Sequence, residues 1–221
     1  MKKLGEVPMM DRDNFLEALN AIKERVLAAN GEIFEFEVGE PVNKELIDEI
    51  EHKYGVPFPS DFVRFLTTIA GKVDISWGIF TDDWFRRGQQ LPFNCPDNGR
   101  LYWNAEQYFR DEIEWYTQNP RNLPFLHQKL LLSQVGNGDL ILFDLAPAGS
   151  QKPIIYYSHD ADYEGLPQVA TCFENYVKNL LKLGLVGDDF YNLEPFLNSE
   201  TGGIDAEQPN AMAWRKLFGL M

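Results

Sequence analysis

Few residues in this chain have the types and spacing that catalysis or metal binding requires. The histidines, His52, His127 and His159, are far apart and form neither an HxxxH nor an HExxH pattern. Cys95 and Cys172 are equally isolated, and neither has a CxxC neighbour. Zinc and iron sites need several such ligands at short, regular spacings. The sequence therefore predicts no metal centre and no cofactor, and it predicts two ordinary thiols in a reducing compartment.

One acidic segment, Asp160-Ala-Asp162-Tyr163-Glu164-Gly165, superficially resembles the opening of an EF-hand calcium loop. An EF-hand closes its coordination sphere with a bidentate glutamate at position 12, where this chain has Thr171. Pro167 also falls inside the segment. We therefore interpret it as a solvated acidic loop that joins a strand to a helix. His159 lies directly before this acidic segment.

Patterns that hold a phosphate or a nucleophile are incomplete. Gly136-Asn-Gly138 lacks a third glycine and a following helix, whereas a phosphate cradle needs N–H groups aimed by a helix N-terminus. There is no GxSxG elbow and no triad spacing. Adjacent carboxylates such as Asp82-Asp83 do not by themselves indicate a shared site. The sequence thus predicts a protein that is not an enzyme, and a hydrolase or calcium-dependent enzyme built from scattered acids is the least favoured alternative.

The charge of the chain narrows the choice of partner. Its 221 residues include 34 acids and 20 bases, a net charge of −14. Such a surface repels nucleic acid and anionic lipid, and it attracts a basic protein. Residues 136–210 hold 12 acids and 3 bases, so −9 of the charge lies there. No apolar segment reaches the roughly 20 residues of a membrane span, and no signal peptide is recognisable. We expect a soluble, cytoplasmic protein, for which plain solubility is the simpler explanation of the charge.

The elements that must position these residues follow from apolar periodicity and capping signals. Asn43 and Ser60 are expected to cap two helices of a hairpin, and Thr171 with Glu174 fits a capping box that opens a later helix. Helices are predicted over 11–30, 43–55, 60–71, 104–118, from 171 onward and, as a short segment, 211–218.

Strands are predicted where hydrophobic residues alternate or form short runs. In the first of them, Phe34, Phe36 and Val38 are expected on the buried face, opposite Glu35 and Glu37. Trp77 is expected in the core. The segment 81–104 is expected to be a long surface loop. The predicted strands cover 32–38, 73–80, 129–135, 140–145 and 154–159.

The order of several short motifs resembles the SUKH superfamily, which includes bacterial toxin-immunity proteins and fungal cell-wall assembly regulators. The resemblance implies an α+β fold with a mainly antiparallel central sheet flanked by helices, and it implies no enzymatic activity. It covers about 40–185 of a single domain, 1–221, with 11–38 and 186–221 as extensions. The motifs are Ile50-Glu51, Tyr54-Gly55, Phe58-Pro59-Ser60-Asp61-Phe62, Phe65-Leu66, Gly136-Asn-Gly-Asp139 with LILFDL, Pro153-Ile-Ile-Tyr-Tyr-Ser-His159 and Thr171-Cys-Phe-Glu174.

The resemblance also implies a partner, a cognate toxin that is often a nuclease. Charge adds a mechanism, because a protein of net charge −14 would be steered onto a basic toxin surface and would compete there with nucleic acid. An intracellular scaffold or regulatory module is the alternative. Aromatic side chains among acids describe a protein-binding surface, and the predicted contact residues are Asp82, Asp83, Trp84, Asp160, Asp162, Tyr163 and Glu164.

Overall fold

The computed structural model of the chain describes residues 10–107, 128–159 and 166–221, and for Lys53 and Tyr54 it describes the backbone only. The helices lie close to the predicted segments wherever apolar periodicity was strong. They are α1 (Arg12–Ala28), α2 (Lys44–Tyr54), α3 (Ser60–Thr68), α4 (Asp82–Gly88), α5 (Ala105–Gln107), α7 (Phe173–Lys182), α8 (Phe190–Leu193), the 3₁₀ helix η3 (Glu194–Phe196) and α9 (Pro209–Phe218).

The strands pair in antiparallel fashion, and together with the helices they confirm the predicted α+β class. Within the described residues they form a three-stranded sheet β1-β2-β3, a four-stranded sheet β4-β5-β6-β7 and a short β8-β9 hairpin. The bounds are β1 (Glu32–Val38), β2 (Lys72–Gly78), β3 (Asn98–Asn104), β4 (Lys129–Gln134), β5 (Leu140–Asp144), β6 (Ile154–Tyr157), β7 (Gln168–Ala170), β8 (Leu197–Asn198) and β9 (Gly203–Ile204).

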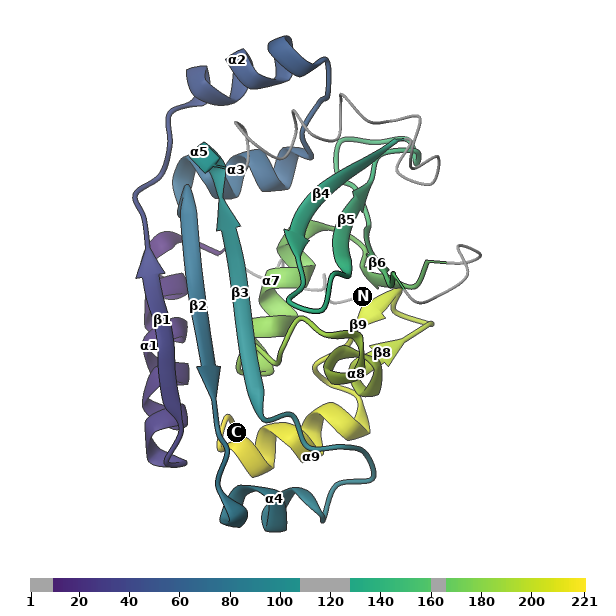
Figure 1. The fold of residues 1–221 in the computed structure, drawn as a ribbon. Helices are drawn as coiled ribbons and strands as arrows, with labels where there is room; N and C mark the ends of the chain where they lie inside the picture. The colour runs from purple at the N-terminus through teal and green to yellow at the C-terminus, as the bar shows by residue number, and fades with distance from the viewer. Residues whose placement is uncertain (1–9, 108–127, 160–165) are drawn as a thin grey trace, which may run out of the picture.

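The three-stranded sheet has one covered and one open face. Figure 1 shows α1 behind β1 and β2, whereas none of the described helices lies over the face turned to the viewer. On the covered face Ile75 and Trp77 are buried, and α1 contributes Phe15 and Leu19 to the same core. Because side chains alternate along a strand, Ser76 and Gly78 are directed to the open face.

A β-bulge in β1 overturns the predicted alternation of its side chains. Ile33 pairs with Trp77 and Glu35 pairs with Ser76, so Phe34 is an extra residue without a partner in β2. A bulge of this kind re-aims a side chain. Phe34 is therefore not on the covered face as predicted but is 50 % exposed, while Phe36 keeps its expected place and lies beneath Lys23 of α1.

The helical hairpin forms as predicted, but one of its caps is different. Asn43 caps α2, because its side chain accepts a hydrogen bond from the Leu46 N–H at 2.9 Å. Ser60 is the first residue of α3 and does not cap it; Pro59 takes the N-cap position, and no side-chain hydrogen bond is made there. The Ser60 N–H instead donates to the Ser150 carbonyl at 2.8 Å, which ties the hairpin to a distant loop.

The capping box predicted at Thr171 and Glu174 is also wrong. The N-cap of α7 is Cys172, and its side chain makes no capping hydrogen bond. A buried carboxylate from α3 acts in its place, since Asp61 Oδ2 accepts from the Glu174 N–H at 3.0 Å. Glu174 is free to form ion pairs with Arg64 at 3.0 Å and with Lys178 at 2.7 Å.

The segment 81–104 is more ordered than the predicted loop. It contains α4 and the whole of β3, whose residues alternate between buried and half-buried. Glycine, proline and asparagine in this stretch obscured a strand whose partner, β2, is distant in sequence. The helix predicted over 104–118 begins after Asn104, but only Ala105–Gln107 fall within the described residues.

The C-terminal helix α9 packs into an aromatic cluster with α4 and β2. Trp214 lies 5.8 Å from Trp84, and Phe218 lies 5.3 Å from Trp77, measured between ring centroids. The indole nitrogen of Trp214 donates to the Leu183 carbonyl at 2.8 Å. The segment 186–221 thus contributes to the same hydrophobic core as the residues of the SUKH resemblance.

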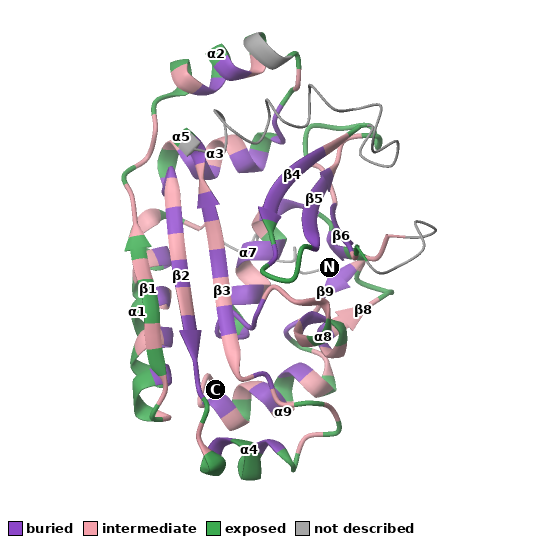
Figure 2. Cartoon of the chain, viewed as in Figure 1, coloured by how far each residue is buried: buried purple, intermediate pink, exposed green. Residues whose placement is uncertain are grey.

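The four-stranded sheet is the most deeply buried part of the fold. Figure 2 shows β4, β5 and β6 almost entirely in the colour of buried residues, and all four residues of β6 are buried. Their continuous apolar sequence fits a sheet covered on both faces. Over the part of the chain that the structure describes, no helix combines the length and the apolar character needed to cross a bilayer.

Candidate functional site

The predicted contact residues of α4 divide between the surface and the core. Asp82 and Asp83 are exposed in the first turn of the helix. Trp84 is only 2 % exposed, and its indole nitrogen donates to the Pro96 carbonyl at 3.1 Å. The expectation that Trp84 forms part of an exposed surface is therefore wrong. Its role is structural, because it fills the core beneath α4.

The other predicted contact residues, Asp160, Asp162, Tyr163 and Glu164, lie outside the described residues. The strand before them, β6, belongs to the four-stranded sheet. The helix α4 instead follows β2 of the three-stranded sheet. Figure 1 shows β6 and α4 well separated. Asp82 and Asp83 therefore belong to a different region of the fold from β6.

Two phenylalanines near α4 form an exposed aromatic surface that the sequence did not reveal. Phe34, the bulge residue, is 50 % exposed and Phe80 is 61 % exposed; their near-parallel rings have centroids 6.4 Å apart. Both rings lie over Gly78 on the open face, where an added Cβ would come under 3.0 Å from each ring. Since glycine leaves this space free, the rings rest on the backbone of β2. We call this pair the Phe34–Phe80 platform.

Carboxylates flank the platform on the same face of the sheet. Glu32 is in register with Gly78 and Glu35 with Ser76, so both side chains start from the open face. Both glutamates are exposed, and neither forms an ion pair with any residue that the structure describes. The platform is thus an apolar surface beside unneutralised negative charge.

The other charges of the region are largely balanced. Glu37, further along β1, pairs with Lys72 at 2.5 Å. On α4, Arg86 and Arg87 follow one turn after Asp82 and Asp83, and Arg86 lies 3.8 Å from Asp83. The negative surplus beside the platform therefore comes from β1 more than from α4.

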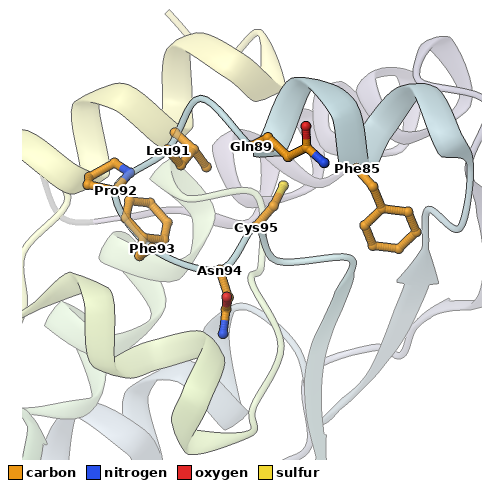
Figure 3. Close-up of a pocket in the computed structure, with 8 residues that line it drawn as sticks. Phe85, Gln89, Leu91, Pro92, Phe93, Asn94 and Cys95 are labelled. Atoms are coloured by element: carbon orange, nitrogen blue, oxygen red, sulfur yellow. The ribbon is translucent and has the colours of Figure 1, made fainter.

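A cavity of about 620 Å³ lies between α4 and the loop that follows it. Figure 3 shows Leu91, Pro92 and Phe93 on one side of it and Phe85 on the other, directed away from them. Cys95 is the nucleophilic group in its lining. Burial and the neighbouring Asp97 raise the pKa of Cys95 to about 11, so the thiol is protonated at neutral pH and is a poor nucleophile.

The exposed Gly136–Asp139 turn ends in a buried carboxylate. Asp139 is 3 % exposed and accepts hydrogen bonds from Tyr156 Oη at 2.7 Å and from Asn137 Nδ2 at 2.9 Å. It also accepts from the backbone N–H of His159 at 2.9 Å, and its Oδ1 lies 2.6 Å from His159 Nδ1. Tyr156 Oη in turn accepts from the Phe190 N–H at 3.1 Å. The carboxylate therefore links the turn, the end of β6 and the start of α8.

The electrostatics around this carboxylate favour an ionised Asp139. Burial raises its pKa, but the hydrogen bonds from Tyr156, His159 and Asn137 outweigh burial, and the net effect is a lowered pKa. Burial and the bond to Asp139 raise the pKa of Tyr156. An aspartate beside a histidine can orient a general base, but here the carboxylate is occupied by local donors. We interpret the group as a structural clamp.

No metal centre emerges where the structure gives positions. In the ranges 10–107, 128–159 and 166–221 no group of three or more histidine, cysteine, aspartate or glutamate side chains is arranged to hold an ion. His52 is exposed, and the two cysteines are free thiols. His127 lies outside these ranges.

The platform could not be predicted from the sequence for two reasons. Phe34 and Phe80 are more than forty residues apart, and Phe34 occupies a bulge that interrupts the alternation of β1. Phe34 alternates correctly with Phe36, so periodicity assigns it to the core. The position of Phe80 outside an element had a local signal, because Phe80 directly precedes Thr81, the N-cap of α4. Gly78 at the end of an apolar strand was the other clue, because such a glycine often marks close approach of another group.

The described residues thus combine an antiparallel α+β fold with an exposed aromatic pair beside acids and a buried carboxylate held by local hydrogen bonds. The family model of the SMI1 / KNR4 family (SUKH-1) matches residues 41–179, which is more than half of the chain. The protein therefore belongs to the SMI1 / KNR4 (SUKH-1) family. A search of curated proteins gives no match to the chain.

Proposed function

We propose that this protein is a non-enzymatic immunity protein that binds and neutralises a cognate bacterial toxin through an acidic surface, and that the toxin is a basic protein such as a nuclease. The observation that carries the proposal is the Phe34–Phe80 platform beside Glu32 and Glu35, on a chain of net charge −14. Family membership supports an immunity or regulatory role without naming a partner.

The physical mechanism combines steering with an apolar anchor. Long-range attraction between an acidic protein and a basic one raises the rate of encounter. Aromatic side chains that become buried at the centre of an interface then supply most of the binding free energy. A nuclease has a basic surface because it must bind a polyanion, so an acidic protein that covers this surface also blocks its substrate.

The test is a rescue experiment with the protein encoded by the adjacent gene. That protein is expressed with and without this chain, and cell survival and complex formation are measured. We expect this chain to restore survival and to co-purify with the toxin. Equal killing with and without this chain would refute the immunity function.

Two regions are proposed to contact the toxin, and separate variants distinguish them. One region is the platform with Asp82 and Asp83. The other is the acidic segment that contains Asp160, Asp162, Tyr163 and Glu164. Alanine substitutions are made in each region and tested for rescue. A loss confined to one set assigns the interface. Tyr191→Ala is the control for the platform set only, because Tyr191 is 76 % exposed on α8, which Figure 1 shows apart from β2 and α4.

The alternative is a scaffold or regulatory module for partners that are not toxins. The same exposed platform favours it, because an aromatic surface beside acids suits any basic protein partner. The gene neighbourhood separates the two functions: a toxin gene directly upstream favours immunity, whereas unrelated housekeeping genes favour the scaffold.

A further inference from the structure

The Phe34–Phe80 platform has the chemistry of a cation site more than that of a purely apolar patch. Two near-parallel phenyl rings are half exposed or more, and the carboxylates of Glu32 and Glu35 start from the same face of the sheet. An aromatic face attracts a cation through its quadrupole, and a carboxylate beside it supplies an ionic partner. Such a site differs from a hydrophobic groove because it selects for positive charge.

Its geometry favours a planar cation. A guanidinium stacks flat on an aromatic ring, presents N–H donors in its plane and is more weakly hydrated than an ammonium. The carboxylates of Glu32 and Glu35, which start from the same face of the sheet, can accept those donors. An ammonium is also attracted to a ring face, but it is a compact, strongly hydrated point charge that cannot stack flat on the ring.

We infer that the Phe34–Phe80 platform, with Glu32 and Glu35, is the point at which the protein receives an arginine side chain of its partner. The inference rests on the proposed function, since it names the group on the basic partner that this surface recognises. The negative charge of the surface favours an arginine over a second copy of the chain. A second copy would place its own Glu32 and Glu35 against these carboxylates, and the like charges would repel.

Gly78 allows the two rings to lie directly on the backbone of β2, because it has no Cβ. It is absent from the glycines with positive φ, so alanine can adopt its backbone conformation. An alanine Cβ would come under 3.0 Å from both rings, and the atoms it meets lie at the far ends of the two side chains, which can rotate away. Gly78→Ala therefore displaces the rings without removing either of them.

The test uses nona-arginine and nona-lysine peptides as probes and isothermal titration calorimetry at low ionic strength. We expect the protein to bind nona-arginine about two- to fivefold more tightly than nona-lysine, the range of an exposed cation–π contact. Phe34→Ala and Phe80→Ala should each reduce this preference, and so should Gly78→Ala. Glu32→Gln with Glu35→Gln should weaken both peptides to a similar extent. Tyr191→Ala is the matched aromatic control.

Equal affinity for the two peptides in the unmodified protein would overturn the inference, as would an arginine preference that survives loss of both phenylalanines. Thermal melts verify that each variant is folded. Sedimentation of the protein alone adds a further outcome: a dimer that dissociates in the Phe34→Ala, Phe80→Ala variant would assign the platform to a second copy. Failure of the peptide test with intact toxin rescue would remove the arginine site and leave the immunity function standing.

Discussion

At the scale of single residues, the buried Asp139 carboxylate accepts hydrogen bonds from Tyr156, Asn137 and the His159 backbone. Replacement by asparagine keeps the shape but puts an N–H₂ group in place of one carboxylate oxygen, opposite the donor of either Tyr156 or the His159 backbone. We expect Asp139→Asn to lower the free energy of unfolding by about 2–3 kcal/mol, the cost of leaving buried polar groups unsatisfied. Urea unfolding at pH 7 measures this. An unchanged midpoint would contradict the clamp interpretation.

The lowered pKa of Asp139 also predicts the direction of a pH effect. In the folded protein the carboxylate stays ionised at a pH where the unfolded chain, with a pKa of about 3.9, has begun to take up a proton. Stability from this group is therefore present above about pH 4 and is lost as the pH falls through the folded pKa. The Asp139→Asn variant should lose less stability than the unmodified protein between pH 5 and pH 3, as followed by thermal melts; parallel curves would argue against this linkage.

At the scale of elements, the start of α7 depends on a side chain from another helix. Asp61 of α3 accepts the hydrogen bond that an N-cap residue would otherwise accept, and Cys172 makes no such bond. We expect Asp61→Ala to destabilise the protein by about 1–2 kcal/mol, the usual cost of losing a helix cap. Denaturant unfolding measures the loss.

The matched control for Asp61 is Thr171→Ala. Thr171 is exposed. Its hydroxyl accepts a hydrogen bond from the Asn175 side chain at 2.8 Å and caps no backbone N–H of α7. We expect a change within about 0.5 kcal/mol, as is usual for a surface substitution. The reverse ranking, with Thr171→Ala more damaging than Asp61→Ala, would restore the capping box that the sequence predicts.

At the scale of the whole molecule, we propose that 1–221 folds as a single domain and that the C-terminal segment is part of its core. Removal of 186–221 would expose Trp77 and Trp84, both nearly fully buried against α9. Because removal of one large buried aromatic side chain costs about 3–5 kcal/mol, loss of the helix should prevent cooperative folding. Circular dichroism and thermal melts of residues 1–185 test this. A cooperative melt close to that of the full chain would show that the segment is an appendage.

The net charge of −14 leads to a prediction for the complex as a whole. If steering brings the toxin to the acidic surface, its association rate should fall by about tenfold or more between low and physiological salt, as the screening length shortens to about 8 Å. Stopped-flow mixing at several salt concentrations measures the rate. Arginine recognition at the platform should affect mainly the dissociation rate, so Phe34→Ala should leave the salt dependence of association unchanged. A salt-independent association rate would refute steering.

The elements that the sequence predicts well are those whose signal is local. The apolar stripe Phe15, Leu19, Ile22 and Val26 predicts α1, and all four residues are buried. Asn43 is correctly predicted as a cap because the bond it accepts comes from a residue only three positions away. The family resemblance is confirmed for the same reason, since its motifs preserve their order along the chain.

The sequence by itself determined the α+β class, most of the described helices and strands, the net charge of −14 and the family. Only the tertiary structure decided which residues are available to a partner. It buried Trp84 under α9, moved Phe34 to the open face through a bulge and gave the capping of α7 to Asp61. Each of these depends on contacts between residues far apart in the chain. Periodicity indicates which face of a helix or strand is apolar. It does not indicate which element packs on that face, or where a bulge inserts an extra residue into a strand.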